Sequence, residues 1–458
     1  MIKRNEKPPH SETLKFHLPQ IDTFNLENGL EVFFVQKKTL PFLYMNLVVD
    51  AGSKYDPQGK KGLANLFARM ADEGAAEYDS LALSDEFDII GANFSINCNQ
   101  DSIYVSLQVL QEEFERGLEL FTKVILDPHL HQIDFDREKR KVSTRIMQIQ
   151  DDADEIANQV FEYKIFGNLN PYAFPTIGYE KDVDIISIND IREYYKNNLM
   201  PEHSFLVVVG DYAADKLRQV LNNGFIKWKR ASISAADLSF KTSLAPGLYF
   251  VNKKDSVQSE LRTGLISFKR NEYDYYARSI LNTIFGGQFS SRINLNLREN
   301  KGFTYGAFSR FIYFKSSAYF YISTSIGIEN TAVSINEIIN EIEKIRSGIT
   351  KEELEFAKSS LIRKFPANFE SHRQIAANII GQVIHSLPDN YFEKYIDEIN
   401  NVTMERINKA AEDNLNPDNL ITIVVGDTSK LKEQLKQFHP KVLHELDIHG
   451  NEIGELQF

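Results

Sequence analysis

The sequence predicts an α+β protein made of two homologous domains. Each domain is expected to contain a mostly antiparallel sheet with helices packed on it. Two observations carry this prediction. In each half, strand-like runs rich in aromatic and β-branched residues occur together with longer runs of helical periodicity. The second half also repeats features of the first half at one constant offset.

The repeat is clearest at two places that lie far apart within each half. The run FLVVVGD ends at Asp211 and the run LITIVVGD ends at Asp427, and 427 minus 211 is 216. The same offset relates VQKK at 35–38 to VNKK at 251–254. A period this long excludes a solenoid and indicates domain duplication. We therefore predict an N-terminal domain at 1–232, a linker at 233–246 and a C-terminal domain at 247–458.

Composition limits the function classes. With 458 residues, the chain is long enough for two domains with sizeable cores. The net charge of −12 argues against nucleic-acid binding. Cys98 is the only cysteine, which excludes an intrachain disulfide and a cysteine zinc site.

The sequence shows neither a membrane-spanning run nor a signal-peptide pattern. The longest apolar runs, such as 205–209, are far too short to span a bilayer, so we expect no membrane span. The run MIKRNEKPPHSE has no apolar core. We expect a cytoplasmic protein as written, and a periplasmic or exported one if a leader was removed.

The first half contains strands and helices in a mixed order. The predicted strands are LEVFFVQK at 30–37, FLYMNLVVDAGS at 42–53, ANFSINCNQ at 92–100, SIYVSLQVL at 102–110 and FLVVVGD at 205–211. The first predicted helix begins at Gly62. The other predicted helices cover 80–90, 111–126, 135–151, 154–166 and 188–199.

The helix GLANLFARM has two distinct faces. Its apolar face consists of Leu63, Leu66, Phe67 and Met70. Asn65, Ala68 and Arg69 follow the i, i+3, i+4 spacing of an inverted zinc-peptidase helix, in which two histidines hold the metal and a glutamate is the general base. Asn65 is a poor zinc ligand, Ala68 has no proton acceptor, and Arg69 brings a positive charge. Without further information, this face would be an ordinary solvated surface.

Five segments together resemble one family. They are AGS at 51–53, GLAN at 62–65, PTIGYEKDV at 175–183, VVVGD at 207–211 and FGGQFSSRINLNLRENKGFTYG at 285–306. These segments resemble the pitrilysin/insulinase-like metallopeptidases, which include the mitochondrial processing peptidase. The resemblance covers nearly the whole chain. It implies that the two domains form a clam-shaped half-chamber.

The resemblance implies a degenerate zinc site. In active members the helix reads HxxEH, and these positions fall on Asn65, Ala68 and Arg69. The third ligand, a glutamate, aligns with Arg145, and 145 minus 69 is 76, which fits the family spacing. We therefore expect this chain to bind no cofactor itself. Because two arginines without counterions would be unfavourable, we expect a bound anion or acidic neighbours, with Asp72, Glu73 and Glu138 as candidates.

The family also includes heterodimers, in which one subunit carries the zinc helix and the other an arginine and a tyrosine. This pair aligns with Arg298 and Tyr305 in LRENKGFTY. Either side chain can stabilise the oxyanion formed during peptide hydrolysis. The resemblance implies a non-catalytic, substrate-binding subunit, inactive alone, that completes the active site of a homologous HxxEH-bearing zinc subunit. Gly286 and Gly287 lack the lysine and serine of a phosphate loop, so we predict a flexible turn lining the chamber.

Other interpretations stay open at this point. The chain could be a structural or peptide-binding homologue without a proteolytic role, and the least favoured alternative is an autonomous peptidase with an unrecognised metal site. Arg298 and Tyr305 could be a salt-bridged arginine and a half-buried tyrosine. A homodimer of the isolated chain is also left open. Five histidines without a matching carboxylate spacing are predicted to be surface residues: His129, His131, His439, His444 and His449.

Overall fold

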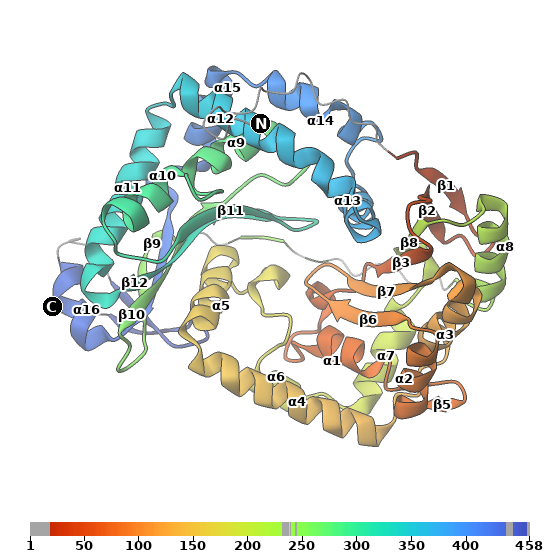
Figure 1. Cartoon of the computed structure of the whole chain (residues 1–458). Helices are drawn as coiled ribbons and strands as arrows, with labels where there is room; N and C mark the ends of the chain where they lie inside the picture. Colours follow the sequence, from red (N-terminus) through yellow and green to blue (C-terminus); the bar gives the residue numbers. More distant parts are fainter. Residues whose placement is uncertain (1–18, 231–237, 239, 243–244, 437–442, 456–458) are drawn as a thin grey trace, which may run out of the picture.

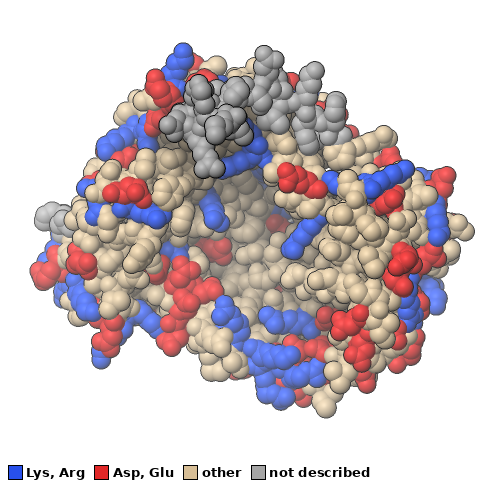
Figure 2. Space-filling model, in the orientation of Figure 1, with Lys and Arg blue, Asp and Glu red and all other residues tan. Residues whose placement is uncertain are grey.

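The computed structural model describes residues 19–230, 238, 240–242, 245–436 and 443–455. The predicted linker at 233–246 lies largely outside this range, and so does His439. The described chain forms two large sheets, one from each half, with helices around them (Figure 1). The space-filling view shows a hollow between the two halves (Figure 2), which agrees with the expected clam-shaped arrangement.

The sheet of the N-terminal half has six strands in the order β1-β2-β8-β3-β7-β6. Their bounds are Asp22–Asn25 (β1), Glu31–Gln36 (β2), Phe42–Val49 (β3), Asn93–Cys98 (β6), Ile103–Leu110 (β7) and Ser204–Gly210 (β8). The sheet is antiparallel except for the pair β2 and β8. A separate small ribbon consists of β4 (Gly74–Ala75) and β5 (Tyr78–Asp79).

The sheet of the C-terminal half has seven strands in the order β11-β12-β10-β13-β9-β14-β15. Their bounds are Gly247–Asn252 (β9), Gln258–Ile266 (β10), Ala307–Tyr313 (β11), Ala318–Gly327 (β12), Ile421–Gly426 (β13), His444–Leu446 (β14) and Glu452–Glu455 (β15). The order β9-β13-β10-β12-β11 repeats the order β2-β8-β3-β7-β6 of the first half.

The repeat extends to the register of strand pairing. In the first half, β2 and β8 are parallel and Glu31 lies opposite Phe205. In the second half, β9 and β13 are parallel and Gly247 lies opposite Ile421. Both partners differ by the predicted offset, since 247 minus 31 and 421 minus 205 are each 216. The two halves are therefore homologous domains, as the sequence predicts.

The helices of the first half are Leu63–Met70 (α1), Ser80–Ile89 (α2), Phe114–Leu126 (α3), Gln132–Asp151 (α4), Ala153–Phe166 (α5), Glu180–Ile185 (α6), Ile188–Asn198 (α7) and Ala214–Phe225 (α8). Six of these helices agree closely with the predicted ones, and two further helices, α6 and α8, were not predicted. The helix predicted at 111–126 begins with a 3-10 turn at Gln111–Glu113, and α4 begins three residues earlier than predicted.

The second half contains a further set of helices. Their bounds are Tyr275–Phe285 (α9), Arg292–Asn294 (α10), Thr331–Arg346 (α11), Lys351–Lys364 (α12), His372–Ile384 (α13), Tyr391–Asn400 (α14), Met404–Asn414 (α15) and Thr428–Leu435 (α16). Among the described residues, no helix is long and apolar enough to cross a bilayer.

The two domains exchange one helix each. Helix α5 belongs to the N-terminal half, but its residues Val160 and Phe161 pack against Ile423 of the C-terminal sheet. Helix α13 belongs to the C-terminal half, but Ile379 packs against Val207 of the N-terminal sheet. Each sheet therefore has helices of its own domain on one face and a helix from the other domain on the opposite face (Figure 1).

Equivalent turns of the two domains also meet. Asp101 lies in the β6–β7 turn and is 5% exposed. Its carboxylate accepts hydrogen bonds from Lys54 Nζ (3.0 Å), from the Tyr172 hydroxyl (2.6 Å) and from the backbone N–H of Lys315 (2.8 Å) in the β11–β12 turn. This buried contact holds the two domains together at the point where their sheets approach each other.

Candidate functional site

Helix α1 carries Asn65, Ala68 and Arg69, three of the four positions predicted to form a degenerate zinc site. Its predicted apolar face is buried, with Leu63, Leu66, Phe67 and Met70 no more than 4% exposed. The Asp56 carboxylate accepts hydrogen bonds from the backbone N–H groups of Gly62 and Ala64, at 2.8 Å each, and so fixes the start of the helix. Burial raises the pKa of Asp56 to about 7, although these hydrogen bonds act in the opposite direction.

The start of α1 also depends on two glycines in backbone contact. Gly62 has a φ of 101° and Gly178 has a φ of 82°. A Cβ on Gly178 would lie 2.0 Å from the carbonyl oxygen of Lys61, and a Cβ on Gly62 would lie 2.5 Å from that of Ile177. Glycine at both positions therefore allows the GLAN and PTIGYEKDV segments to pack directly on each other.

The residues at the predicted zinc-site positions have side chains that are poor metal ligands. Arg69 is exposed and its Nε donates a hydrogen bond to Asn65 Oδ1 at 3.1 Å, while Ala68 is buried at 4% exposure. Helix α4, which carries Arg145, packs against α1. An amide, a methyl group and two guanidinium groups do not match the nitrogen, sulfur and carboxylate ligands that zinc prefers. In the described part of the chain, no group of three or more His, Cys, Asp or Glu residues could hold a metal ion.

The acidic neighbours differ from the expected ones. Arg145 has an acidic partner, but it is Glu155 at the start of α5, whose Oε1 accepts from Nη2 at 2.9 Å. Of the three candidates, Glu73 and Glu138 form ion pairs with Arg137 of α4 instead. The prediction that named Asp72, Glu73 and Glu138 is therefore wrong for Arg145. The chain turns directly from α4 into α5, and this turn places Glu155 next to Arg145.

Asp72 makes no ion pair with a described residue. Burial, with the nearby charges of Glu73 and Glu138, raises the pKa of Asp72 to about 6. The acidic groups near the end of α1 thus repel one another and are balanced by Arg137 and Lys141.

Arg298 and Tyr305 lie on one segment that follows α10. Arg298 is in a short π-helical turn, Leu295–Asn300, and its guanidinium lies over the ring of Phe289, 4.7 Å from the ring centroid. Its Nε is 3.3 Å from Glu299 Oε1. The Tyr305 side chain is 91% exposed and makes no hydrogen bond to a described residue. The alternative interpretation is therefore wrong for a half-buried tyrosine, but its salt-bridged arginine is confirmed by the ion pair of Arg298 with Glu299.

The backbone on both sides of Tyr305 is firmly anchored. The Phe303 N–H donates to the Leu297 carbonyl at 2.9 Å, and the Thr304 hydroxyl donates to the Gly306 carbonyl at 2.9 Å. The Thr324 hydroxyl of β12 donates to the same Gly306 carbonyl at 2.9 Å. These bonds hold the phenol outward from the domain on an ordered support.

Two further exposed aromatic residues lie close to this segment and were not singled out from the sequence. Phe289 is 61% exposed beneath Arg298, and Phe308 is 52% exposed beside Gly306. Exposed aromatic side chains next to an arginine are typical of binding surfaces. The sequence could have indicated them by position, because Phe289 lies inside the family-like segment at 285–306 and Phe308 lies just after it.

Gly286 and Gly287 end α9 in close contact with the edge strand β11. The carbonyl of Gly286 accepts a hydrogen bond from the Ser309 N–H at 3.0 Å, and a Cβ on Gly286 would lie 2.4 Å from Ser309 Oγ. A Cβ on Gly287 would lie 2.7 Å from Asn282 Nδ2. The glycines therefore allow a close backbone approach, and a role in lining the chamber stays a prediction.

Four of the histidines predicted to be surface residues are described: His129, His131, His444 and His449. They contact other rings or backbone, and no described group of residues around them could hold a metal ion. The rings of His129 and His131 are 4.8 Å apart, and His129 Nε2 lies 2.7 Å from the Ala76 carbonyl oxygen. The ring of His444 stacks on Tyr249, and His449 contacts Tyr179.

Two family models match this chain. One, described as Insulinase (Peptidase family M16), matches residues 32–171, and another, described as Peptidase M16 inactive domain, matches residues 186–361. Together they cover more than half of the chain. The chain belongs to the insulinase family of peptidases. The family expected from the sequence is thereby confirmed.

Curated members of the insulinase family similar to this chain include both zinc-protease and non-peptidase names. An "Uncharacterized zinc protease" of Rickettsia bellii is 23% identical, over 83% of this chain and 90% of its own length. The "Non-peptidase homolog YmxG" of Helicobacter pylori is 21% identical, over 88% of this chain and 93% of its own length. The match to the inactive-domain model and the non-peptidase name of one relative fit a non-catalytic role for this insulinase-family chain.

Solved structures support the same fold. The crystal structure of a peptidase M16 inactive domain from Pseudomonas fluorescens superposes with a TM-score of 0.84 at 23% identity, covering 89% of this chain and 98% of that chain. A protease from Helicobacter pylori gives a TM-score of 0.83 at 19% identity, covering 89% of this chain and 100% of that chain.

Proposed function

We propose that this chain is the non-catalytic, substrate-binding subunit of a heterodimeric zinc metallopeptidase. Its partner would be a homologous subunit that carries HxxEH and the catalytic zinc. Arg298 and Tyr305 would reach the partner's zinc site and stabilise the negative charge that develops on the peptide carbonyl oxygen. The chain alone would be inactive, because Asn65, Ala68, Arg69 and Arg145 provide neither zinc ligands nor a general base.

One observation carries this proposal: Tyr305 projects into solvent from an anchored backbone, on the same segment as Arg298. A phenol that is 91% exposed contributes little to the core of its own domain. The hydrogen bonds of Phe303, Thr304 and Thr324 nevertheless fix its position. An ordered support for an exposed hydroxyl is what a group acting on another subunit requires, because preorganised donors stabilise a transition state without reorganisation.

The test is an add-back assay. The chain and its HxxEH-bearing relative from the same organism are purified separately and mixed, and cleavage of an unstructured fluorogenic peptide is followed. We expect no cleavage by this chain alone, and faster cleavage by the mixture than by the partner alone. Sedimentation should show the two chains in one complex.

Two outcomes would contradict the proposal. A mixture no faster than the partner alone would favour a structural or peptide-binding homologue without a proteolytic role. Zinc-dependent cleavage by this chain alone would show that it is an autonomous peptidase with a different metal site.

A further inference from the structure

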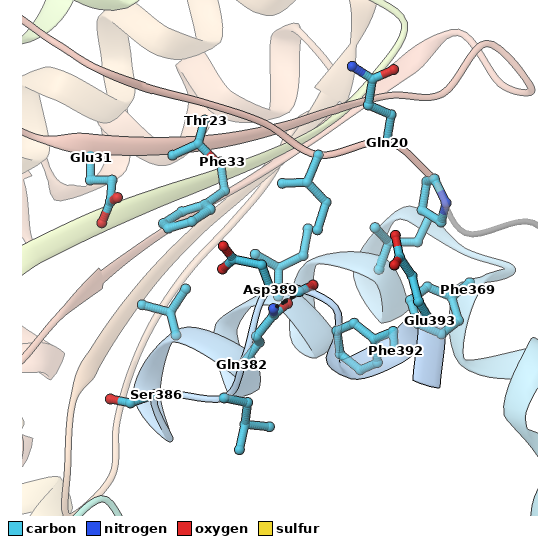
Figure 3. A pocket seen from close by; sticks show the side chains of 16 residues that line it. Gln20, Thr23, Glu31, Phe33, Phe369, Gln382, Ser386, Asp389, Phe392 and Glu393 are labelled. Atoms are coloured by element: carbon cyan, nitrogen blue, oxygen red, sulfur yellow. Dashed lines mark hydrogen bonds between the residues drawn. The ribbon is translucent and has the colours of Figure 1, made fainter. Parts of the chain in front are cut away.

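A cavity of about 770 Å³ lies where the two domains meet (Figure 3). One wall comes from the N-terminal domain and includes Ile21, Thr23 and Phe33, in or next to β1 and β2. The other wall comes from the C-terminal domain and includes Ile379 of α13 and Phe392 of α14. Figure 3 shows the strands on one side of the cavity and the helices on the other. Neither Arg298 nor Tyr305 lines it.

The inner surface of this interdomain groove is partly apolar and partly polar. Ile375 and Ile379 form part of it and are 1% and 2% exposed, while Phe33 and Phe392 are half-buried. Ligand sites typically combine a volume of about 300–1,000 Å³ with an apolar lining and a few polar groups. The groove therefore has the size and the surface to hold apolar side chains of a bound segment.

The charged groups of the groove all have one sign. Glu31 lies on the strand side, and Asp389 and Glu393 lie on the helix side (Figure 3). None of the described lining residues is Lys, Arg or His, and none of these three carboxylates forms an ion pair with another described residue. Charge complementarity therefore favours a ligand that carries a positive charge.

The groove also adjoins a sheet edge that no described strand covers. Strand β1 is the outermost strand of the six-stranded sheet and pairs with β2 on one side. Pro19, Gln20, Ile21 and Thr23 bring this edge to the groove. An extended peptide can add to an exposed sheet edge through backbone hydrogen bonds while its side chains enter neighbouring pockets.

We propose that the interdomain groove binds an extended peptide segment in which a Lys or Arg lies next to apolar residues. The apolar side chains would contact Phe33, Ile379 and Phe392, and the basic group would lie between Glu31 and the pair Asp389 and Glu393. This peptide site is separate from the surface around Arg298 and Tyr305. Its test uses this chain alone, so its failure would leave the proposed function intact.

The experiment is fluorescence anisotropy with the full chain and a labelled peptide. The probe is Ala-Phe-Lys-Leu-Ala, acetylated and amidated, and its control is the same peptide with Glu in place of Lys. We expect the Lys peptide to bind more tightly, and its affinity to fall with added salt because the attraction is screened. The double variant Asp389→Asn/Glu393→Gln should bind about fivefold more weakly.

The matched control is Glu180→Gln/Asp184→Asn, which removes two exposed carboxylates from α6, outside the groove. Its affinity should equal that of the unchanged chain. Equal binding of the Lys and Glu peptides, or equal losses in the two double variants, would overturn the proposal. It would also be overturned if Asp389→Asn/Glu393→Gln dissociated a homodimer, or if the peptide bound only after deletion of residues 1–18.

Discussion

At the scale of single residues, side-chain chemistry and a family resemblance predicted a degenerate zinc site, but the contacts of its residues could be read only from the structure. The sequence is sufficient to show that Asn65, Ala68 and Arg69 cannot serve as HxxEH. It does not show that Glu155 pairs with Arg145, because that contact depends on the sharp junction between α4 and α5. The exposure of Tyr305 was equally hidden, since a tyrosine beside a glycine is compatible with burial or exposure.

Restoring the ligands tests the alignment of Arg145. The variant Asn65→His/Ala68→Glu/Arg69→His/Arg145→Glu should bind about one zinc ion per chain, because it would present two histidines and a glutamate in the family geometry. Elemental analysis of the dialysed protein measures this. The same variant with Arg145 retained should bind zinc more weakly, since it lacks one ligand and keeps a nearby positive charge. A folded quadruple variant without bound zinc would contradict the alignment.

At the scale of elements, periodicity predicted most of the first half, and packing explains what it could not predict. The apolar side of α5 was visible as a helix, but its sequence does not say which sheet it covers. Tertiary packing, not local sequence, determines that α5 contacts the C-terminal sheet. Similarly, GLAN predicts a helix start, but the contact of Gly62 with Gly178 depends on a segment far along the chain.

The backbone contact at Gly178 should be sensitive to a single methyl group. Gly178→Ala should lower the free energy of unfolding by about 3–5 kcal/mol, from the positive φ together with the clash with Lys61. Gly59→Ala is the matched control, because Gly59 has a φ of 80° and open space where a Cβ would lie. It should cost about 1–2 kcal/mol, measured by urea unfolding. Equal losses would show that the close contact is unimportant.

Helix α5 should give stability a pH dependence. Burial raises the pKa of Glu162 to about 7 from 4.5, although the Tyr319 hydroxyl donates a hydrogen bond to it. The folded chain therefore keeps this proton up to about pH 7, whereas the unfolded chain releases it near pH 4.5. The stabilisation is present below pH 4.5 and is lost as pH rises towards 7.

Glu162→Gln should remove this dependence. Between pH 5 and pH 8, urea unfolding should show the variant gaining about 1–2 kcal/mol relative to the unchanged chain. Glu180→Gln, an exposed change on α6, is the control and should run parallel to the unchanged chain. Parallel curves for Glu162→Gln would rule out a proton held by Glu162.

At the scale of the whole molecule, domain duplication was readable from one offset, and the exchange of helices between domains was not. The repeat fixes which strands correspond, and the identical offset in the parallel pairs confirms it. The positions of α5 and α13 depend on the relative orientation of the two sheets, which the sequence does not reveal. That arrangement makes the domain contacts, including the one at Asp101, part of the stability of the whole chain.

Asp101→Asn should destabilise the molecule strongly. The variant removes a negative charge that pairs with the buried Lys54 ammonium. It should lower the free energy of unfolding, measured with urea, by about 3–5 kcal/mol. Asp151→Asn is the matched control, because Asp151 also joins the two halves, through Lys253, but is 88% exposed. It should have little effect. Comparable losses in both variants would contradict a special role for the buried contact.

The central claim is that Tyr305 acts on a partner's active site. Its most direct test is the kcat of the assembled pair when this chain carries Tyr305→Phe, with Tyr273→Phe, a second partly exposed tyrosine, as the control. We predict unchanged assembly and an approximately 100-fold lower kcat for Tyr305→Phe, the usual effect of removing one oxyanion donor, and no change for the control. An unchanged kcat for Tyr305→Phe in an intact complex would contradict the account.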